Sequence, residues 1–248
     1  MLNPFPSYLN KQPIEKRTNL YEGTFLDVHS IFYTIQGEGP FVGRPAIFIR
    51  LAGCNLQCPG CDTDYTSGRH IYSVDMVVDR VRLVTPSHRD ARGRMLVVIT
   101  GGEPFRQNLT PLIKDLRLCL YDVQIETNGT LAPYNPEIYE NSRITTIVCS
   151  PKAGKIHPKL EPLIDAYKYV LSADSVDSED GLPVLALGHT ASPRVARPRA
   201  GFIGPVYLQP MDSGDEDTNR RNLKAVIDSA MRYNFIVCLQ LHKIIGME

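Results

Sequence analysis

Three cysteines stand close together, and their thiols are the side chains best suited to chemistry. Cys54, Cys58 and Cys61 are spaced C-x3-C-x2-C, so one short loop can bring all three to a single metal centre. A structural zinc site takes four protein ligands, and no histidine or fourth cysteine stands nearby in the sequence. A [4Fe-4S] cluster usually takes four thiolates, so three would leave one iron open to a substrate or cofactor. The loop predicts a reactive iron–sulfur centre. Zinc completed by a distant residue is the alternative.

The composition indicates one globular domain. The 248 residues are enough for a full core, and we expect a single domain over residues 1–248. The 27 basic and 27 acidic residues cancel, which argues against general binding to nucleic acid or to a membrane surface. The chain has no apolar run of membrane-spanning length, and its first residues lack a signal-peptide core, so we expect a cytoplasmic protein. Cys119, Cys149 and Cys238 stand singly in apolar runs and are expected to be inert, buried thiols.

The elements that must position the cysteine loop are apolar strands alternating with helices. Strands are expected within residues 31–40, 45–53, 95–99, 123–129, 144–149, 167–171, 206–209 and 235–241. Helices are expected over 73–84 with Ser73 as N-cap, 108–120 with Pro111 in its first turn, and 219–233. Residues 1–24 are predicted to be an N-terminal arm, 86–94 a loop and 175–204 an irregular insertion. The alternation predicts an α/β fold with parallel strand pairing, in a partial, compressed (β/α) barrel.

Polar or glycine-rich residues follow most of the predicted strands. They are the cysteine loop and the stretches Thr100–Glu103, Glu126–Gly129, Ser150–Lys152 and Gln209–Asp212. Because the carboxyl ends of parallel strands meet at one edge, these residues are expected to surround a common ligand site. Arg50 interrupts the apolar run before the cysteine loop and needs an anionic partner, from the protein or from a ligand.

These motifs, in this order, carry a resemblance to a known family. The cysteine loop with a downstream Thr100-Gly-Gly-Glu-Pro resembles the radical S-adenosylmethionine (SAM) superfamily. The stretches Gln36-Gly-Glu-Gly, Cys61-Asp-Thr and Gln240-Leu-His-Lys narrow the resemblance to the 7-carboxy-7-deazaguanine synthase family. One departure is Gly60, because radical SAM proteins commonly have an aromatic residue before the third cysteine.

The resemblance implies a fold, a reaction and cofactors. It implies a radical SAM lyase that converts 6-carboxy-5,6,7,8-tetrahydropterin to 7-carboxy-7-deazaguanine with loss of ammonia. The three cysteines would hold a [4Fe-4S] cluster, SAM would bind its fourth iron, and Mg2+ would hold the substrate carboxylate. A homodimer and an external, flavodoxin-like electron donor are also implied. The alternatives are a glycyl-radical-activating enzyme, which would need a large protein partner, and a non-catalytic iron–sulfur protein.

The resemblance also assigns candidate site residues. Asp62 and Thr63 are the expected Mg2+ ligands; the alternative is that Asp62 caps the following turn and Thr63 only packs. The expected SAM-binding residues are Gly60, Asp62, Gly102, Glu103, Ser150, Pro151, Lys152, Gln209, Pro210, Met211 and Asp212. The expected substrate-binding residues are Ile35, Gln36, Gly37, Glu38, Arg50, Thr100, His242 and the C-terminal Glu248. The alternatives are a structural ion pair for Arg50, a plain surface turn for Ser150–Lys152 and an ordinary core or surface histidine for His242.

Overall fold

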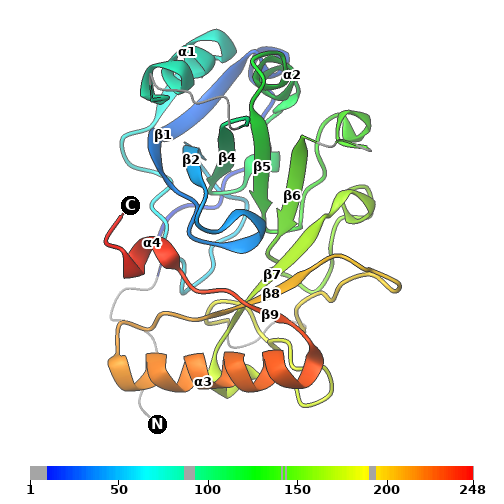
Figure 1. Cartoon of the computed structure of the whole chain (residues 1–248). Helices are drawn as coiled ribbons and strands as arrows, with labels where there is room; N and C mark the ends of the chain where they lie inside the picture. Colours follow the sequence, from blue (N-terminus) through cyan, green and yellow to red (C-terminus); the bar gives the residue numbers. More distant parts are fainter. Residues whose placement is uncertain (1–9, 87–92, 141, 143, 190–193, 248) are drawn as a thin grey trace.

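The computed structural model describes residues 10–86, 93–140, 142, 144–189 and 194–247, and it is organised by one curved sheet (Figure 1). The nine-stranded sheet has the order β3-β1-β2-β4-β5-β6-β7-β8-β9. Its strands are β1 (Phe25–Ile35), β2 (Pro45–Leu51), β3 (His70–Ser73), β4 (Leu96–Gly101), β5 (Asp122–Thr127), β6 (Thr145–Cys149), β7 (Ala166–Leu171), β8 (Val206–Pro210) and β9 (Ile236–Val237). The linear strand order leaves β3 and β9 as edges, so the sheet is an open barrel, as predicted.

Strand direction agrees with the prediction from β2 onwards and differs before it. The neighbours from β2 to β9 pair in parallel. The strand β1 pairs antiparallel with both β2 and β3, so an antiparallel edge precedes the parallel barrel. The short strand β3 was not predicted, and β9 has two residues where a longer strand was expected. The polar stretch 86–94 lies largely outside the described residues.

The three longer helices were predicted, and their ends have physical causes. The helix α1 (Val74–Val84) begins after Ser73, whose Oγ accepts a hydrogen bond from Met76 N at 3.3 Å. The helix α2 (Thr110–Leu118) has Pro111 in its first turn, where the missing N–H costs no hydrogen bond. The helix α3 (Glu216–Tyr233) begins three residues earlier than expected, because Asp215 caps it. A short helix, α4 (Leu241–Ile244), follows β9.

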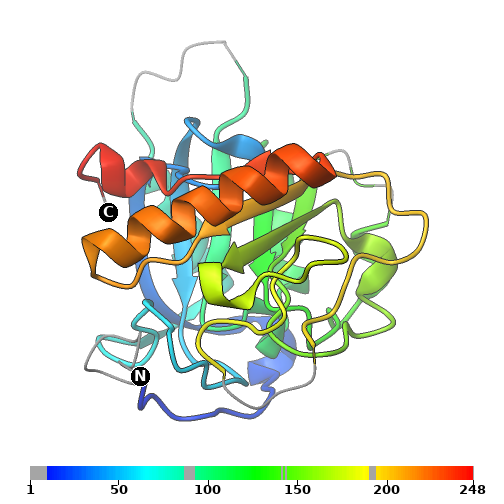
Figure 2. The ribbon, with the colours of Figure 1, turned by 90° about the horizontal axis from the view of Figure 1, so that it is seen from below.

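Several stretches outside these helices form only single turns of 3-10 helix, so the predicted alternation of strand and helix is incomplete. The 3-10 turns are Leu20–Gly23, Gly39–Phe41, Pro104–Arg106, Pro136–Ile138, Glu161–Leu163 and Ala173–Ser175. The helices α1 and α2 lie at one end of the molecule, and α3 lies against β8 and β9 at the other (Figures 1 and 2). In the described residues no helix is long and apolar enough to cross a membrane.

The two faces of the sheet differ because successive side chains in a strand point to opposite sides. In β2, Ile47, Ile49 and Leu51 are buried in the main hydrophobic core. The alternate residues Phe48 and Arg50 face the inside of the open barrel and line its cavity. The same alternation in β4, β5, β7 and β8 directs Thr100, Glu126, Lys168 and Gln209 into that cavity. The alternation of side chains in several neighbouring strands therefore forms the polar lining of one site.

Candidate active site

A cavity of about 510 Å³ lies inside the barrel at the carboxyl ends of the parallel strands. Its size suits a small-molecule site. Most of the predicted site residues line it: Ile35, Gln36, Glu38, Arg50, Cys54, Cys58, Gly60, Cys61, Asp62, Thr63, Thr100, Gly102, Ser150, Lys152, Gln209, Met211, Asp212 and His242. The sheet thus brings together residues that are widely separated in the sequence.

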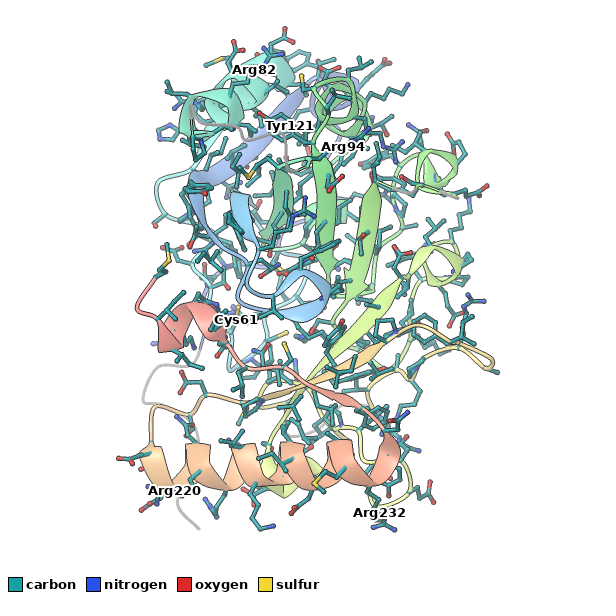
Figure 3. All side chains as sticks on the ribbon, viewed as in Figure 1. Cys61, Arg82, Arg94, Tyr121, Arg220 and Arg232 are labelled. Carbon is teal, nitrogen blue, oxygen red and sulfur yellow. The ribbon has the colours of Figure 1, made fainter. Side chains whose placement is uncertain are left out.

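The cysteine loop forms one wall of this cavity, and the N-terminal arm holds it in place. Ile14 forms a parallel bridge with Cys54, and Glu15 N donates to Cys54 O at 2.7 Å. The side chain of Asn10 donates to Cys58 O at 3.2 Å. The arm therefore supports the loop instead of merely crossing the surface. Figure 3 places Cys61 near the middle of the molecule, beside α4.

The three thiols fit an iron–sulfur cluster better than a zinc ion. All three line the same cavity, and they are free thiols. Burial raises the pKa of each, that of Cys54 to about 12, so cluster assembly must displace their protons. In the described part of the chain, no three His, Cys, Asp or Glu side chains are close enough to hold one metal ion. A cluster does not need that arrangement, because each thiolate binds a different iron.

The pair Gly101-Gly102 is required by the close approach of β2 to β4. Gly101 has φ of +121°, and a Cβ there would lie 2.2 Å from Leu51 O. A Cβ on Gly102 would lie 2.0 Å from Gly53 O. Gly102 N donates to Leu51 O, and Glu103 N donates to Gly53 O, both at 3.1 Å. The motif therefore fixes the backbone that leads into Cys54.

Glu103 occupies a different place from the one expected for a SAM ligand. It is fully buried outside the cavity lining, and its carboxylate accepts from Phe105 N at 3.0 Å, Thr127 Oγ1 at 2.7 Å and Asn128 N at 2.7 Å. Burial raises its pKa to about 7 despite these hydrogen bonds. Glu103 therefore ties the end of β4 to the end of β5.

Four other predicted residues also lie outside the lining or the described chain. Pro151 and Pro210 do not line the cavity, although their neighbours do. Gly37 packs against His242 and accepts a hydrogen bond from Leu241 N at 3.0 Å, so it seats α4 instead of facing a ligand. Glu248 lies outside the described residues.

Arg50 has the features of an anion-binding residue. Its Nε is buried without a hydrogen-bond partner, and no carboxylate in the described chain forms an ion pair with it. The guanidinium carbon lies 5.4 Å from the centre of the Phe32 ring. The structural ion pair considered from the sequence is therefore not found among the described residues. The Oε1 of Gln209 is likewise buried and unpartnered in the lining.

Three charged residues of the cavity were missed as site residues: Lys168, Glu126 and Lys243. Lys168, on β7, has a side chain that is 10% exposed and forms an ion pair with Glu38. Glu38 also accepts from Gln240 Nε2 at 3.0 Å. Burial alone would raise the pKa of Glu38, but the charge and hydrogen bond of Lys168 outweigh it and hold that pKa below its ordinary value. Lys168 could have been found by the reasoning applied to Arg50, because it too interrupts an apolar strand.

Glu126 is the second missed residue, although its strand-end motif was noticed. Its carboxylate accepts from Gln124 Nε2 at 2.8 Å, Gln36 Nε2 at 3.1 Å and Thr100 Oγ1 at 3.2 Å. This network faces the same cavity as Arg50 and Lys168. It offers acceptors and donors to a polar heterocycle.

The helix α4 closes the cavity beside the cysteine loop. Lys243 Nζ lies 2.9 Å from Asp212 Oδ2 and 3.7 Å from Asp62 Oδ2. The hydrogen bond from Lys243 lowers the pKa of Asp212 to about 2. Thr63 Oγ1 donates to Asp62 Oδ1 at 3.3 Å, and both side chains line the cavity. These hard oxygen atoms can serve a divalent cation that takes its other ligands from substrate and water.

The fold and the site define a radical SAM enzyme. The barrel is open, the loop after β2 carries three thiols that can hold a cluster, and a polar cavity lies beside that loop. Comparison with known proteins makes the assignment narrower. The chain is 40% identical to 7-carboxy-7-deazaguanine synthase of Rhodospirillum rubrum over 90% of this chain and 93% of that protein. It is 39% identical to the enzyme of that name from Rickettsia prowazekii, over 92% and 91% of the two chains.

The chain therefore belongs to the 7-carboxy-7-deazaguanine synthase family. A crystal structure of QueE from Escherichia coli has the same fold, with a TM-score of 0.62 and 24% identity over 90% of this chain and 98% of that one. No protein-family model matches the chain. Membership of a radical SAM family implies a [4Fe-4S] cluster and SAM, which the three thiols fit.

Proposed function

We propose that this chain converts 6-carboxy-5,6,7,8-tetrahydropterin to 7-carboxy-7-deazaguanine and ammonia. The two products together contain all the atoms of the substrate, so the reaction needs no net oxidant or reductant. The observation that carries the proposal is that the cluster thiols and a charged lining share one cavity of about 510 Å³. When bound, the reduced cluster and SAM supply a 5′-deoxyadenosyl radical able to take the hydrogen from C6.

The residues of this chain bind and orient the substrate. Arg50, with its unpaired Nε, would hold the substrate carboxylate by a charge-assisted hydrogen bond. The amino and amide groups of the pterin would meet Glu126 and the ion pair of Glu38 and Lys168. These groups are fixed by other hydrogen bonds before substrate arrives, which lowers the cost of binding.

We infer that Mg2+ takes part through Thr63 and Asp62. Both offer oxygen ligands one or two positions after Cys61, on the cavity wall. Mg2+ usually takes few protein ligands and completes its octahedron with water and substrate. The substrate carboxylate would then be shared between the cation and Arg50.

The expected partners complete the proposal. A flavodoxin-like donor would reduce the cluster, and the protein would work in the cytoplasm. A homodimer is supported by exposed apolar side chains near the C-terminal end, among them Ile236, Val237 and Ile244. Light scattering of the cluster-loaded protein measures that oligomeric state, and a monomeric mass would contradict the dimer.

The test is anaerobic reconstitution with iron, sulfide, SAM, Mg2+, reductant and the carboxylated pterin. Mass spectrometry should find 7-carboxy-7-deazaguanine, with many turnovers for each SAM. Cys58→Ala should lose both the brown colour and turnover, whereas Cys119→Ser, a thiol outside the cavity lining, should keep both. A protein that holds four irons and cleaves SAM but forms no product would refute this substrate.

A further inference from the structure

The segment between β7 and β8 reaches the cysteine loop. Gly60 N donates to Leu187 O at 2.9 Å, and a Cβ on Gly60 would lie 3.2 Å from that same oxygen. The segment therefore occupies the space that a side chain at position 60 would need. Leu187 has φ of +37°, which a residue with a side chain seldom adopts. Such strain persists only where the surroundings fix it, and it is typical of functional sites.

Both hydrogen bonds and hydrophobic packing hold this segment in place. Arg197 donates from Nε to Asp180 Oδ2 at 2.7 Å and from a terminal nitrogen to Pro183 O at 2.8 Å. Ser229 Oγ, on α3, donates to Gly181 O at 2.6 Å. The side chains of Leu182, Ala186 and Val195 belong to the main hydrophobic core. Although it was predicted to be irregular, the described part of the segment is thus a built wall that folds back against the barrel (Figure 2).

This wall gives the cavity an apolar side close to the cluster. Leu187, Val170 and Met211 line both the main cavity and an adjoining cavity of about 150 Å³. The main cavity is also lined by the charged residues that suit a pterin, Glu38, Arg50, Glu126 and Lys168. SAM has a charged methionyl end, which must approach the cluster, and a nucleoside whose adenine base presents flat, apolar faces. The nucleoside is the part of SAM that an apolar wall next to the third cysteine fits.

His189 adds a polar group to the same place. It lines the adjoining cavity, and its Nε2 is buried with no hydrogen-bond partner in the described chain. Burial, with the charge of Lys152, lowers its pKa, so the ring is neutral at pH 7 and can donate or accept. An unpartnered buried nitrogen costs free energy unless a ligand satisfies it.

We propose that Leu187 and His189 hold the nucleoside of SAM. Leu187 packs on the base, and His189 forms a hydrogen bond to it. They take the place of the aromatic residue that radical SAM proteins commonly have at the position of Gly60. Both are positioning residues, supplied by the segment after β7. The proposal rests on the SAM chemistry of the family and not on the pterin substrate, so the two can fail separately.

The test compares the binding of SAM and of methionine to the anaerobic, cluster-loaded protein. Leu187→Ala should weaken SAM about tenfold, as expected for losing part of a buried leucine contact, and His189→Ala about fivefold. Methionine, which lacks the nucleoside, should bind each variant within twofold of the parent. Leu187→Met, which keeps an apolar contact, should retain SAM affinity. Leu83→Ala, on the exposed side of α1, is the matched control.

Iron content and melting temperature show whether each variant is folded and loaded. SAM affinity unchanged in both alanine variants, at four irons per chain, would overturn the proposal. An equal loss of SAM and methionine affinity would overturn it too, because the segment would then act on the cysteine loop and not on the nucleoside. If Leu187→Ala loses the cluster, the comparison falls to His189→Ala, where the same two outcomes decide.

Discussion

Replacing Lys168 with methionine should destabilise the protein strongly, because it leaves a buried carboxylate without its cation. The side chains of Lys168 and Glu38 are 10% and 12% exposed, and they form an ion pair in the cavity wall. Removing one partner of a buried pair costs about 3–5 kcal/mol. Since about a tenth of each side chain still meets water, we expect the lower end, about 3 kcal/mol. For a chain of this size that loss lowers the melting temperature by roughly 6–12 °C.

The stability lost in Lys168→Met should depend on pH, and the pKa shifts of the pair give the direction of that dependence. In the parent protein the pKa of Glu38 is lowered, so the pair contributes stability above the ordinary pKa of glutamate and loses it as the pH falls through the lower, folded value. The pKa of Lys168 is raised, so its contribution is complete below the ordinary pKa of lysine. In Lys168→Met, burial instead raises the pKa of Glu38. The variant should therefore lose less stability at pH 6 than at pH 8.

The assay is anaerobic thermal unfolding of the cluster-loaded protein and its variants. Adding Glu38→Gln to Lys168→Met should restore at least half of the lost stability, because the buried charge is then gone. The control is Lys224→Met, which breaks an exposed pair with Asp228 on α3 and should cost under about 0.5 kcal/mol. A loss below about 1 kcal/mol for Lys168→Met, or no rescue by Glu38→Gln, would refute the reasoning.

Three further changes test other parts of the structure. Gly102→Ala places a Cβ 2.0 Å from Gly53 O, so the reconstituted protein should hold little iron by chemical assay; a full cluster would show that the β2–β4 contact can relax. Arg50→Gln should raise KM for the pterin about 10–100-fold with an unchanged cluster EPR signal, and an unchanged KM would remove Arg50 from the substrate site. Ser73→Ala removes the cap of α1 and should cost about 1 kcal/mol in urea unfolding, with turnover per cluster unchanged; equal stability would mean that Met76 N finds another acceptor.

Much of the barrel was predictable because its strands are largely apolar runs that end in polar motifs. Buried parallel strands have this pattern, and their carboxyl ends must meet. The cysteine loop, the Gly101-Gly102 pair and the lining residue Gln209 were therefore placed correctly from order and spacing alone. The antiparallel β1 was not, since its apolar run looks the same in either direction.

The positions that could not be predicted depend on contacts between distant segments. Glu103 follows a strand like the other polar ends, but a turn directs its carboxylate inwards to Thr127 and Asn128. Nothing in the local sequence distinguishes an inward from an outward carboxylate. Residues 175–204 have weak periodicity, and the described part of this stretch is held by hydrogen bonds from Arg197 and from α3 instead of by a repeating pattern.

Gly60 shows how one departure from a family pattern can be explained by a remote part of the fold. An aromatic side chain at this position would occupy the space that Leu187 fills, since even a Cβ would touch its carbonyl group. The cysteine loop and the segment after β7 are therefore closely packed: a Cβ at position 60 would lie 3.2 Å from Leu187 O, so a larger residue there requires the segment to shift. In our proposal, the segment after β7 supplies the contact with the SAM nucleoside that an aromatic residue before the third cysteine would otherwise make.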